Sequence, residues 1–379
     1  MKTEQAKWQS NHQWVPGKPG QLGQSAQLVI LFGSVKILKQ RDVLNDIRQL
    51  YPNAVLWGCS TAGEICGTQV QDQTLVVTAV RFDHTEVKAT YTRVGNINDS
   101  YQIGKHLALS IPQEGLSHVM VLSDGLQVNG SDLTRGLTEN LPRNVVVTGG
   151  LSGDGGEFKE TVVLCDDICD SGVVSVLGFY GDRIRVGYGS QGGWDPFGPK
   201  RIITKSNRNV LYELDGKPAL SLYKEYLGDH AKGLPATALL FPLCLRNEED
   251  DIGVVRTVLS VDEQHQSMTF AGDLPETYTA QLMKANFDRL IDGAVGAAKA
   301  SCLGDGLARP ELAILISCVG RKMVLKQRVE EEVEGVQDVL GRQAMLTGFY
   351  SYGEICPRGL HEKSALHNQT MTITTFVEE

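Results

Sequence analysis

A motif that occurs twice in this chain constrains its fold more than any other feature. WGCSTAGEIC at residues 57–66 and TGFYSYGEIC at residues 347–356 share the pattern G-x-x-x-x-G-E-I-C. Each copy follows or continues an apolar run with the length of a buried strand. Repetition of a supersecondary unit within one chain is typical of structures in which the copies pack against one another. The motif therefore predicts duplicated α/β units.

The unit around the motif has a regular order of elements. A buried strand is followed by a helix, a second strand, a glycine-rich turn and further strands. The first strands of three such units are expected at residues 28–32, 118–125 and 311–320. The segment between the second and third units, residues 209–301, has a different pattern of helices and strands.

The length of the chain and one change of pattern suggest the domain organisation. At 379 residues the chain is longer than one typical domain. Glycine and proline cluster at residues 190–205, where the pattern changes. We expect a polar N-terminal segment at 1–26, a first domain at 27–195 and a second domain at 196–379. The expected fold class is α/β, with repeated strand-helix-strand units forming mixed sheets in both domains.

Charge and composition argue against several classes of protein. The formal net charge is −9, and the densest basic stretch, residues 321–328, runs directly into acidic residues 330–334, which does not suit nucleic acid. No apolar run approaches the length of a membrane span, and the polar N-terminus is not a signal peptide. The 8 cysteines form no CxxC pair, as is typical of reduced thiols. We expect a soluble, cytoplasmic protein that binds neither nucleic acid nor membranes.

The glycine-rich turns after the second strands are the expected ligand site. In open α/β sheets, ligands bind beyond the carboxyl ends of the strands, where glycine lets the backbone approach them closely. If the units pack side by side, the turns converge on one pocket. The simpler interpretation is that the glycines only form tight corners. The residues expected to bind the ligand are Gly58, Cys59, Ser60, Thr61, Gly63, Glu64, Gly149, Gly150, Asp154, Tyr350, Tyr352, Glu354 and Asn368.

Glu64 and Glu354 occupy equivalent positions in the repeated motif. A pair of carboxylates can act as acid and base, hold an ammonium group of a ligand, or cap backbone N–H groups. Capping or ligand orientation is favoured, because no nucleophile or metal-binding spacing accompanies the two glutamates.

Motifs for catalysis are absent from the sequence. No G-x-S-x-G elbow, phosphate loop or metal-binding spacing is found. Cys59 follows a strand and is the candidate nucleophile, but no base is placed near it by a motif. We therefore expect no catalytic residue and no enzymatic activity.

Three histidines are candidate ligands of a metal or haem. A neutral imidazole suits either role, and His367 lies beside polar residues at the start of the last strand. His361 and His230 are the alternatives. For each histidine, a surface or hydrogen-bonded side chain is the more common role.

Several motifs together resemble the FIST family of bacterial sensory proteins. They are GCSTAGEI, GGLSGDG, NVLYELDGKPALSLYKEYLG, SCVGR, GFYSYGEI and LHNQTMTITT. The resemblance runs from about residue 28 to residue 377, in the order of the family's FIST N-terminal and FIST C-terminal domains. The family's glycine and GEI positions map onto Gly58, Gly63, Glu64, Ile65, Gly353, Glu354 and Ile355, and its LHNQ motif maps onto Leu366, His367, Asn368 and Gln369.

The resemblance implies a sensory module for a small ligand. Members of the family are often linked to histidine kinases, diguanylate cyclases or chemotaxis proteins. Some stand-alone members resembling this chain are haem proteins that sense nitric oxide and control a kinase. We therefore expect haem b, nitric oxide and a separate histidine kinase as partners, although no motif assigns the haem ligand. The alternative is a haem-free sensor of an amino acid or related metabolite, whose ammonium group Glu64 and Glu354 would suit.

Overall fold

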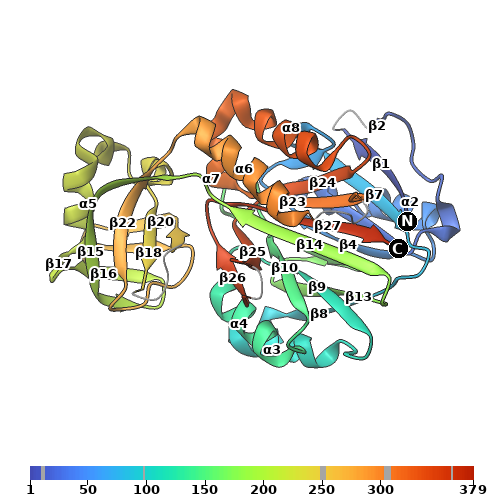
Figure 1. Ribbon diagram of the computed structural model, residues 1–379, viewed down its shortest axis with the longest axis horizontal. Coiled ribbons are helices and arrows are strands. Elements are labelled where there is room, and N and C mark those ends of the chain that lie inside the picture. Colours follow the sequence, from blue (N-terminus) through green and yellow to red (C-terminus); the bar gives the residue numbers. More distant parts are fainter. Residues whose placement is uncertain (10–12, 97–98, 248–252, 303–308, 360–361) are drawn as a thin grey trace.

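A computed structural model describes residues 1–9, 13–96, 99–247, 253–302, 309–359 and 362–379. In this part of the chain, three mixed sheets form a large body, and a fourth, antiparallel set of strands forms a smaller lobe beside it (Figure 1). The mixed α/β architecture with repeated units confirms the predicted fold class.

Each sheet of the body is built around one strand-helix-strand unit. The first and second strands of a unit run parallel and are joined by helices. The elements are β3 (Leu28–Gly33), α1 (Val35–Leu38), α2 (Arg41–Leu50) and β4 (Val55–Ser60) in the first unit; β9 (Leu116–Ser123), α4 (Gly130–Asn140) and β10 (Val146–Leu151) in the second; and β23 (Leu312–Cys318), α7 (Val319–Leu325), η5 (Lys326–Arg328), α8 (Val329–Leu340) and β24 (Met345–Ser351) in the third.

Two further strands complete each sheet on the side of the first strand. A third strand pairs antiparallel with the first strand, and a fourth strand pairs antiparallel with the third. The third strands are β7 (Leu75–Arg81), β13 (Val173–Tyr180) and β27 (Met371–Glu378), and the fourth strands are β1 (Lys2–Trp8), β8 (Glu86–Arg93) and β14 (Ile184–Gln191). The polar N-terminal segment thus contributes β1, which carries β2 (Trp14–Val15) and is followed by η1 (Gly23–Ser25).

Hairpins exchanged between the units lock the three sheets together. After its second strand, each unit sends a hairpin to the second strand of another unit. The hairpins are β5 (Glu64–Cys66) with β6 (Gln69–Gln71) on β24, β11 (Val163–Cys165) with β12 (Ile168–Asp170) on β4, and β25 (Gly353–Pro357) with β26 (Ser364–His367) on β10. The sheets therefore join residues from both sides of the boundary suggested at 195/196.

The first strands are buried on both faces, which explains their continuous apolar runs. Ile30, Met120 and Ile314 point into one core that the three sheets share. Their neighbours in sequence pack against the helices outside the sheets, as Val29 does. The helices η2 (Val94–Asn96), α3 (Ser100–Ser110) and α6 (Phe287–Ser301) complete the body, α3 against α4 and α6 against α8.

The smaller lobe is inserted between β14 and α6 and has its own core, which includes Leu211, Tyr223 and Phe270. Its helices are α5 (Ala219–Leu227), η3 (Gly228–Gly233) and η4 (Ala236–Leu240). Its strands are β15 (Asp195–Asn207), β16 (Val210–Leu214), β17 (Lys217–Pro218), β18 (Leu243–Arg246), β19 (Val254–Arg256), β20 (Val258–Asp262), β21 (Ser267–Phe270) and β22 (Thr279–Lys284). Among the helices of the described residues, none has the length and apolar character needed to cross a membrane.

Candidate ligand site between the body and the inserted lobe

The glycine-rich turns of the three units meet beyond the carboxyl ends of β4, β10 and β24. The Ala62 N–H donates to the Tyr350 carbonyl at 2.8 Å, which joins the first turn to the third. The Gly153 N–H donates to the Ser60 carbonyl at 2.9 Å, which joins the second turn to the first. The turns therefore lie together, as packing of the units side by side requires.

Most glycines of these turns serve close packing of the backbone. Gly58, Gly149 and Gly348 are equivalent, and a Cβ at any of them would lie 1.9 Å from a carbonyl oxygen of the adjacent first strand. A Cβ at Gly150 would lie 2.8 Å from a methyl carbon of the third unit. Gly63 has a φ of +143°, which L side chains rarely adopt. Gly58, Gly149 and Gly348 lie within β4, β10 and β24, so close packing against the adjacent strand explains them without a tight corner or a ligand.

Glu64 fastens the first turn to the strand that follows it. Its Oε1 accepts a hydrogen bond from Thr61 Oγ1 at 2.5 Å, and its Oε2 accepts from the N–H and Oγ1 of Thr74 at 3.0 and 2.8 Å. Burial raises the pKa of the Glu64 carboxyl to about 7, against the effect of these donors.

Glu354 repeats this arrangement in the third unit. Its Oε1 accepts from Ser351 Oγ at 2.7 Å, and its Oε2 accepts from the N–H and Oγ1 of Thr370 at 3.2 and 2.9 Å. Burial raises the pKa of this carboxyl to about 8. Both oxygens of each glutamate are engaged, so the two side chains cap the turns and are poorly placed to hold an ammonium group.

Other residues expected at the site lie in the interior. Cys59 is fully buried in the central core, and burial raises the pKa of its thiol well above the usual range, so Cys59 lacks the access and thiolate character of a nucleophile. Ser60 Oγ accepts from the Val162 N–H at 2.9 Å. The hydroxyl of buried Tyr350 donates to Glu332 Oε1 at 2.6 Å.

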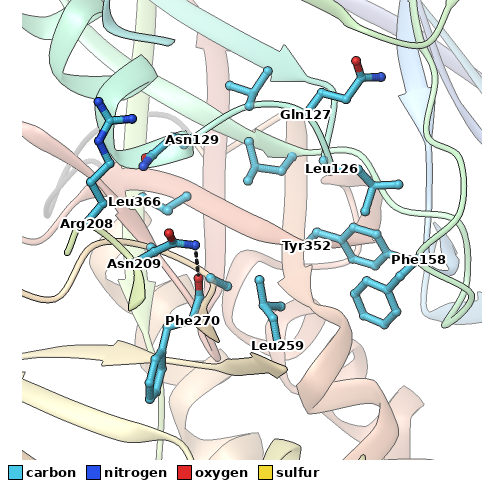
Figure 2. A pocket seen from close by; sticks show the side chains of 16 residues that line it. Leu126, Gln127, Asn129, Phe158, Arg208, Asn209, Leu259, Phe270, Tyr352 and Leu366 are labelled. Atoms are coloured by element: carbon cyan, nitrogen blue, oxygen red, sulfur yellow. Dashed lines mark hydrogen bonds between the residues drawn. The ribbon is translucent and has the colours of Figure 1, made fainter. Parts of the chain in front are cut away.

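A cavity of about 340 Å³ lies where the second unit faces the lobe (Figure 2). Its volume is within the range of about 300–1,000 Å³ that is typical of small-molecule sites. The body supplies the loop after β9, the turn of the third unit and β26, and the lobe supplies the turn after β15 and strands β20 and β21. The lining residues are Gly125, Leu126, Gln127, Val128, Asn129, Gly130, Leu151, Phe158, Arg208, Asn209, Leu259, Phe270, Ala271, Gly272, Tyr352 and Leu366.

One end of the cavity is apolar and aromatic. The Phe158 and Tyr352 rings stack with centroids 4.4 Å apart and planes 13° apart. Leu126, Phe158 and Leu259 line the cavity while remaining 39%, 42% and 44% exposed. Phe158 has a φ of +53°, a strained conformation for a bulky residue, and its N–H donates to Asp154 Oδ1 at 2.9 Å. Asp154, which also accepts from the Tyr352 hydroxyl, thus holds both rings of the wall.

The opposite end of the cavity is polar. Asn129 caps α4 by accepting from the Ser131 N–H at 3.0 Å, and its Nδ2 donates to Asp273 Oδ1 of the lobe at 3.0 Å. Arg208 stands at the tip of the β15–β16 turn with a φ of +51°. Figure 2 shows Arg208 and Asn129 at this end, away from the aromatic pair.

Buried polar contacts join the lobe to the body beneath the cavity. Arg256 of the lobe donates from Nη1 to the Leu366 carbonyl at 3.1 Å. Asn368, expected to bind a ligand, accepts at Oδ1 from the Thr257 N–H of the lobe at 3.5 Å. Asn368 is fully buried, so its amide joins the two bodies rather than lining the cavity.

A second cavity, of about 450 Å³, lies at the equivalent end of the first unit and includes Thr61, Glu64 and Asp154 among its lining residues. Its charged groups largely pair with one another: Lys39 with Glu160, and Lys159 with Glu157 at 2.9 Å. These pairs leave the second cavity less suited to a partly apolar ligand than the first.

His367 and His230 are the candidate haem ligands that lie within the described residues. His367 is buried, and its Nε2 lies 2.9 Å from the Cys356 carbonyl oxygen. The adjoining cavity measures about 220 Å³, below the range of about 300–1,000 Å³ for drug-sized ligands, and a haem is larger than these. His230 is exposed beside the Phe241 ring, and His361 lies outside the described residues. The described residues therefore do not fit a haem at His367 or His230.

Of the residues expected from the sequence, Tyr352 lines the inter-lobe cavity and Asp154 supports its wall. Phe158, Leu126, Leu259 and Arg208 were not anticipated. The exposed apolar side chains among them carry no periodic signal, and the left-handed backbone at Phe158 and Arg208 is invisible in composition.

A family model of the FIST N domain matches residues 27–217, and one of the FIST C domain matches residues 219–357. The uncharacterized protein MJ1623 of Methanocaldococcus jannaschii is 23% identical over an alignment of 367 residues. That match covers 88% of this chain and 66% of the relative, so the chain spans about two thirds of the relative's length.

Two solved structures match nearly the whole chain, and both are enzymes. A chorismatase matches 99% of this chain and 98% of its own at 10% identity with a TM-score of 0.37. A cyanuric acid hydrolase from A. caulinodans matches 94% of this chain and 90% of its own at 8% identity with a TM-score of 0.36. The sequence-based expectation of no enzymatic activity is therefore withdrawn as wrong. At these TM-scores the two enzymes carry no argument about a substrate or reaction of this chain.

Proposed function

This chain belongs to the FIST family, and from that premise we propose that it senses a small ligand in the cleft between the body and the inserted lobe. FIST domains are associated with small-ligand sensing in signalling. The observation that supports this site is the cavity of about 340 Å³ whose walls come from both bodies.

The architecture offers a way to convert binding into a signal. A ligand that touches both walls binds more tightly when the walls are close together. Binding therefore shifts the population toward this closed arrangement. The hydrogen bond of Asn129 to Asp273 spans the same gap, so a bound ligand adds to contacts already made there. We propose that a separate signalling partner, with a histidine kinase as the expected class, reads the position of the lobe.

The proposed sensor is haem-free, because neither His367 nor His230, the two described candidates, fits a haem. This choice takes the metabolite alternative over the haem-based nitric oxide sensor. An absorption spectrum after reconstitution of the purified full chain with haem separates the two. We expect no Soret band that remains after gel filtration, and a stoichiometric Soret band would overturn the haem-free proposal.

A thermal-shift screen with amino acids and small organic acids tests the site itself. We expect at least one compound to raise the Tm, since ligand at 100 times its Kd adds about 2.7 kcal/mol of stability. Leu259→Trp should fill the mouth of the cavity and abolish the shift. Leu109→Trp is the matched control, because Leu109 is 62% exposed on α3 and does not line the cavity.

A compound that shifts the wild type and the Leu109→Trp variant but not the Leu259→Trp variant supports the cleft. Failure of every compound, or an equal shift in all three proteins, would refute the cleft as the sensory site.

A further inference from the structure

We infer that the ligand of this cleft is a small carboxylic acid that carries a planar apolar group, an inference that rests on the proposed function of the cleft. The inference follows from the distribution of charge and apolar surface along the cavity. It narrows the chemical class of the proposed metabolite to an anion rather than an amine.

Arg208 gives the cavity its charge. Among the described residues that line the cavity, Arg208 is the single charged side chain. It is exposed at the tip of a turn, so its guanidinium keeps its donors without the cost of burial. An arginine side chain presents N–H donors in a planar fork that matches a carboxylate.

The carboxylates beside this end of the cleft have other partners. Asp132 pairs with Arg135 at 2.7 Å, and Asp273 accepts from Asn129 at 3.0 Å. Burial raises the pKa of Asp132, the charge of Asp273 adds to this shift, and the charges of Arg135 and Arg208 oppose it. No ion pair of Arg208 occurs within the described part of the chain, which leaves the guanidinium able to take a carboxylate.

The far end of the cavity selects the rest of the ligand. The flat face made by Phe158 on Tyr352 suits a planar group, since aromatic rings favour offset-stacked or edge-to-face contacts. Leu126 and Leu259 add apolar surface on either side. These side chains are about two fifths exposed, and burying their apolar surface against an apolar group of the ligand is favourable.

An ammonium group finds no carboxylate partner among the described residues that line this cavity. No carboxylate occurs among its described lining residues. Glu64 and Glu354, which the sequence suggested for that role, are buried elsewhere with all their oxygens engaged. A buried charge without a partner is costly, so the cavity disfavours amines and amino acids relative to simple acids.

Calorimetric titration of the full chain with three matched probes tests this inference. Phenylacetate has the acid and the ring, phenylacetamide replaces the acid by a neutral isostere, and acetate lacks the ring. We expect phenylacetate to bind at least about tenfold more tightly than either of the others, since hydrogen bonds to charged groups contribute about 1.5–3 kcal/mol.

Arg208→Gln should weaken phenylacetate binding by about 10- to 100-fold. Lys205→Gln is the matched control, because it removes one positive charge from the same hairpin outside the cavity. Far-ultraviolet circular dichroism checks that both variants are folded.

Equal affinity for phenylacetate and phenylacetamide, or no effect of Arg208→Gln, overturns the anionic class, and equal affinity for acetate overturns the planar group. In those cases the cleft remains the proposed ligand site if Leu259→Trp abolishes binding of the probes. If no probe binds while other compounds raise the Tm through the cleft, the ligand class fails and the proposed function survives.

Discussion

A buried ion pair holds the two chain segments that cross between the body and the lobe, and its removal gives a quantitative prediction. Arg321 and Glu332 are both fully buried, and Arg321 Nη2 lies 2.7 Å from Glu332 Oε2. Arg321 also donates to the Gly192 carbonyl at 2.5 Å and to the Leu290 carbonyl at 2.6 Å. Gly192 precedes the lobe and Leu290 follows it, so one guanidinium binds both crossings.

Arg321→Met removes these hydrogen bonds while keeping much of the side-chain volume. It leaves Glu332 buried with the hydroxyls of Ser317 and Tyr350 as its donors. Breaking a buried pair from one side costs about 3–5 kcal/mol, because the remaining charge loses its partner. A folded domain has about 5–15 kcal/mol in all, so the variant should fold with reduced stability.

Urea unfolding of the wild type, Arg321→Met, Glu332→Gln and the double variant measures this coupling. We expect Arg321→Met to lower the free energy of unfolding by about 3–5 kcal/mol. The double variant should be more stable than the sum of the single effects predicts, since it leaves no unpaired buried charge. Limited proteolysis should cut Arg321→Met first near the crossings at residues 192–194 and 285–290.

Two results would refute this reasoning. A loss below about 1 kcal/mol for Arg321→Met would place the pair in the range of exposed salt bridges. Strict additivity in the cycle would show that the two side chains are not energetically coupled.

Two further predictions concern the turns. The folded-state pKa of Glu354 is raised to about 8 and that of Glu64 to about 7, so the folded protein binds more protons than the unfolded chain above pH about 4.5. Each glutamate should therefore make the free energy of unfolding fall as pH rises toward the folded-state pKa, by at most about 1.4 kcal/mol per pH unit. In urea unfolding between pH 5.5 and 7.5, Glu354→Gln should show a smaller fall of the midpoint than the wild type. A wild-type midpoint that is constant over that range would contradict the role of burial. Gly348→Ala should destabilise the fold by about 1–3 kcal/mol or more, since its Cβ would lie 1.9 Å from the Leu315 carbonyl oxygen, whereas Gly17→Ala, with nothing within 4 Å, should be neutral in the same thermal melts; equal Tm values for the two variants would argue against the close approach.

The candidate site was predictable only in part. Repetition of the GEI motif indicated that the turns belong to equivalent units, and Tyr352 and Asp154 do support the inter-lobe cavity. Glu64 and Glu354 share that motif but serve the backbone, because a hydroxyl three residues before each glutamate and one at the next strand take up its oxygens. A motif shows that a residue is equivalent to another, but it does not show which way the side chain points.

The sequence by itself determined the local elements: apolar runs made the first strands, and the spacing of turns between them made the three repeated units. The tertiary structure alone decided that hairpins such as β25–β26 leave their own unit, since any free strand edge offers the same backbone donors and acceptors. It also brought Phe158 of the body and Arg208 of the lobe to one cavity, although they are distant in the chain. The periodicity of apolar residues indicates which face of a helix or strand is buried. A cleft depends on how the surfaces of the body and the lobe pack against each other, which local periodicity does not encode.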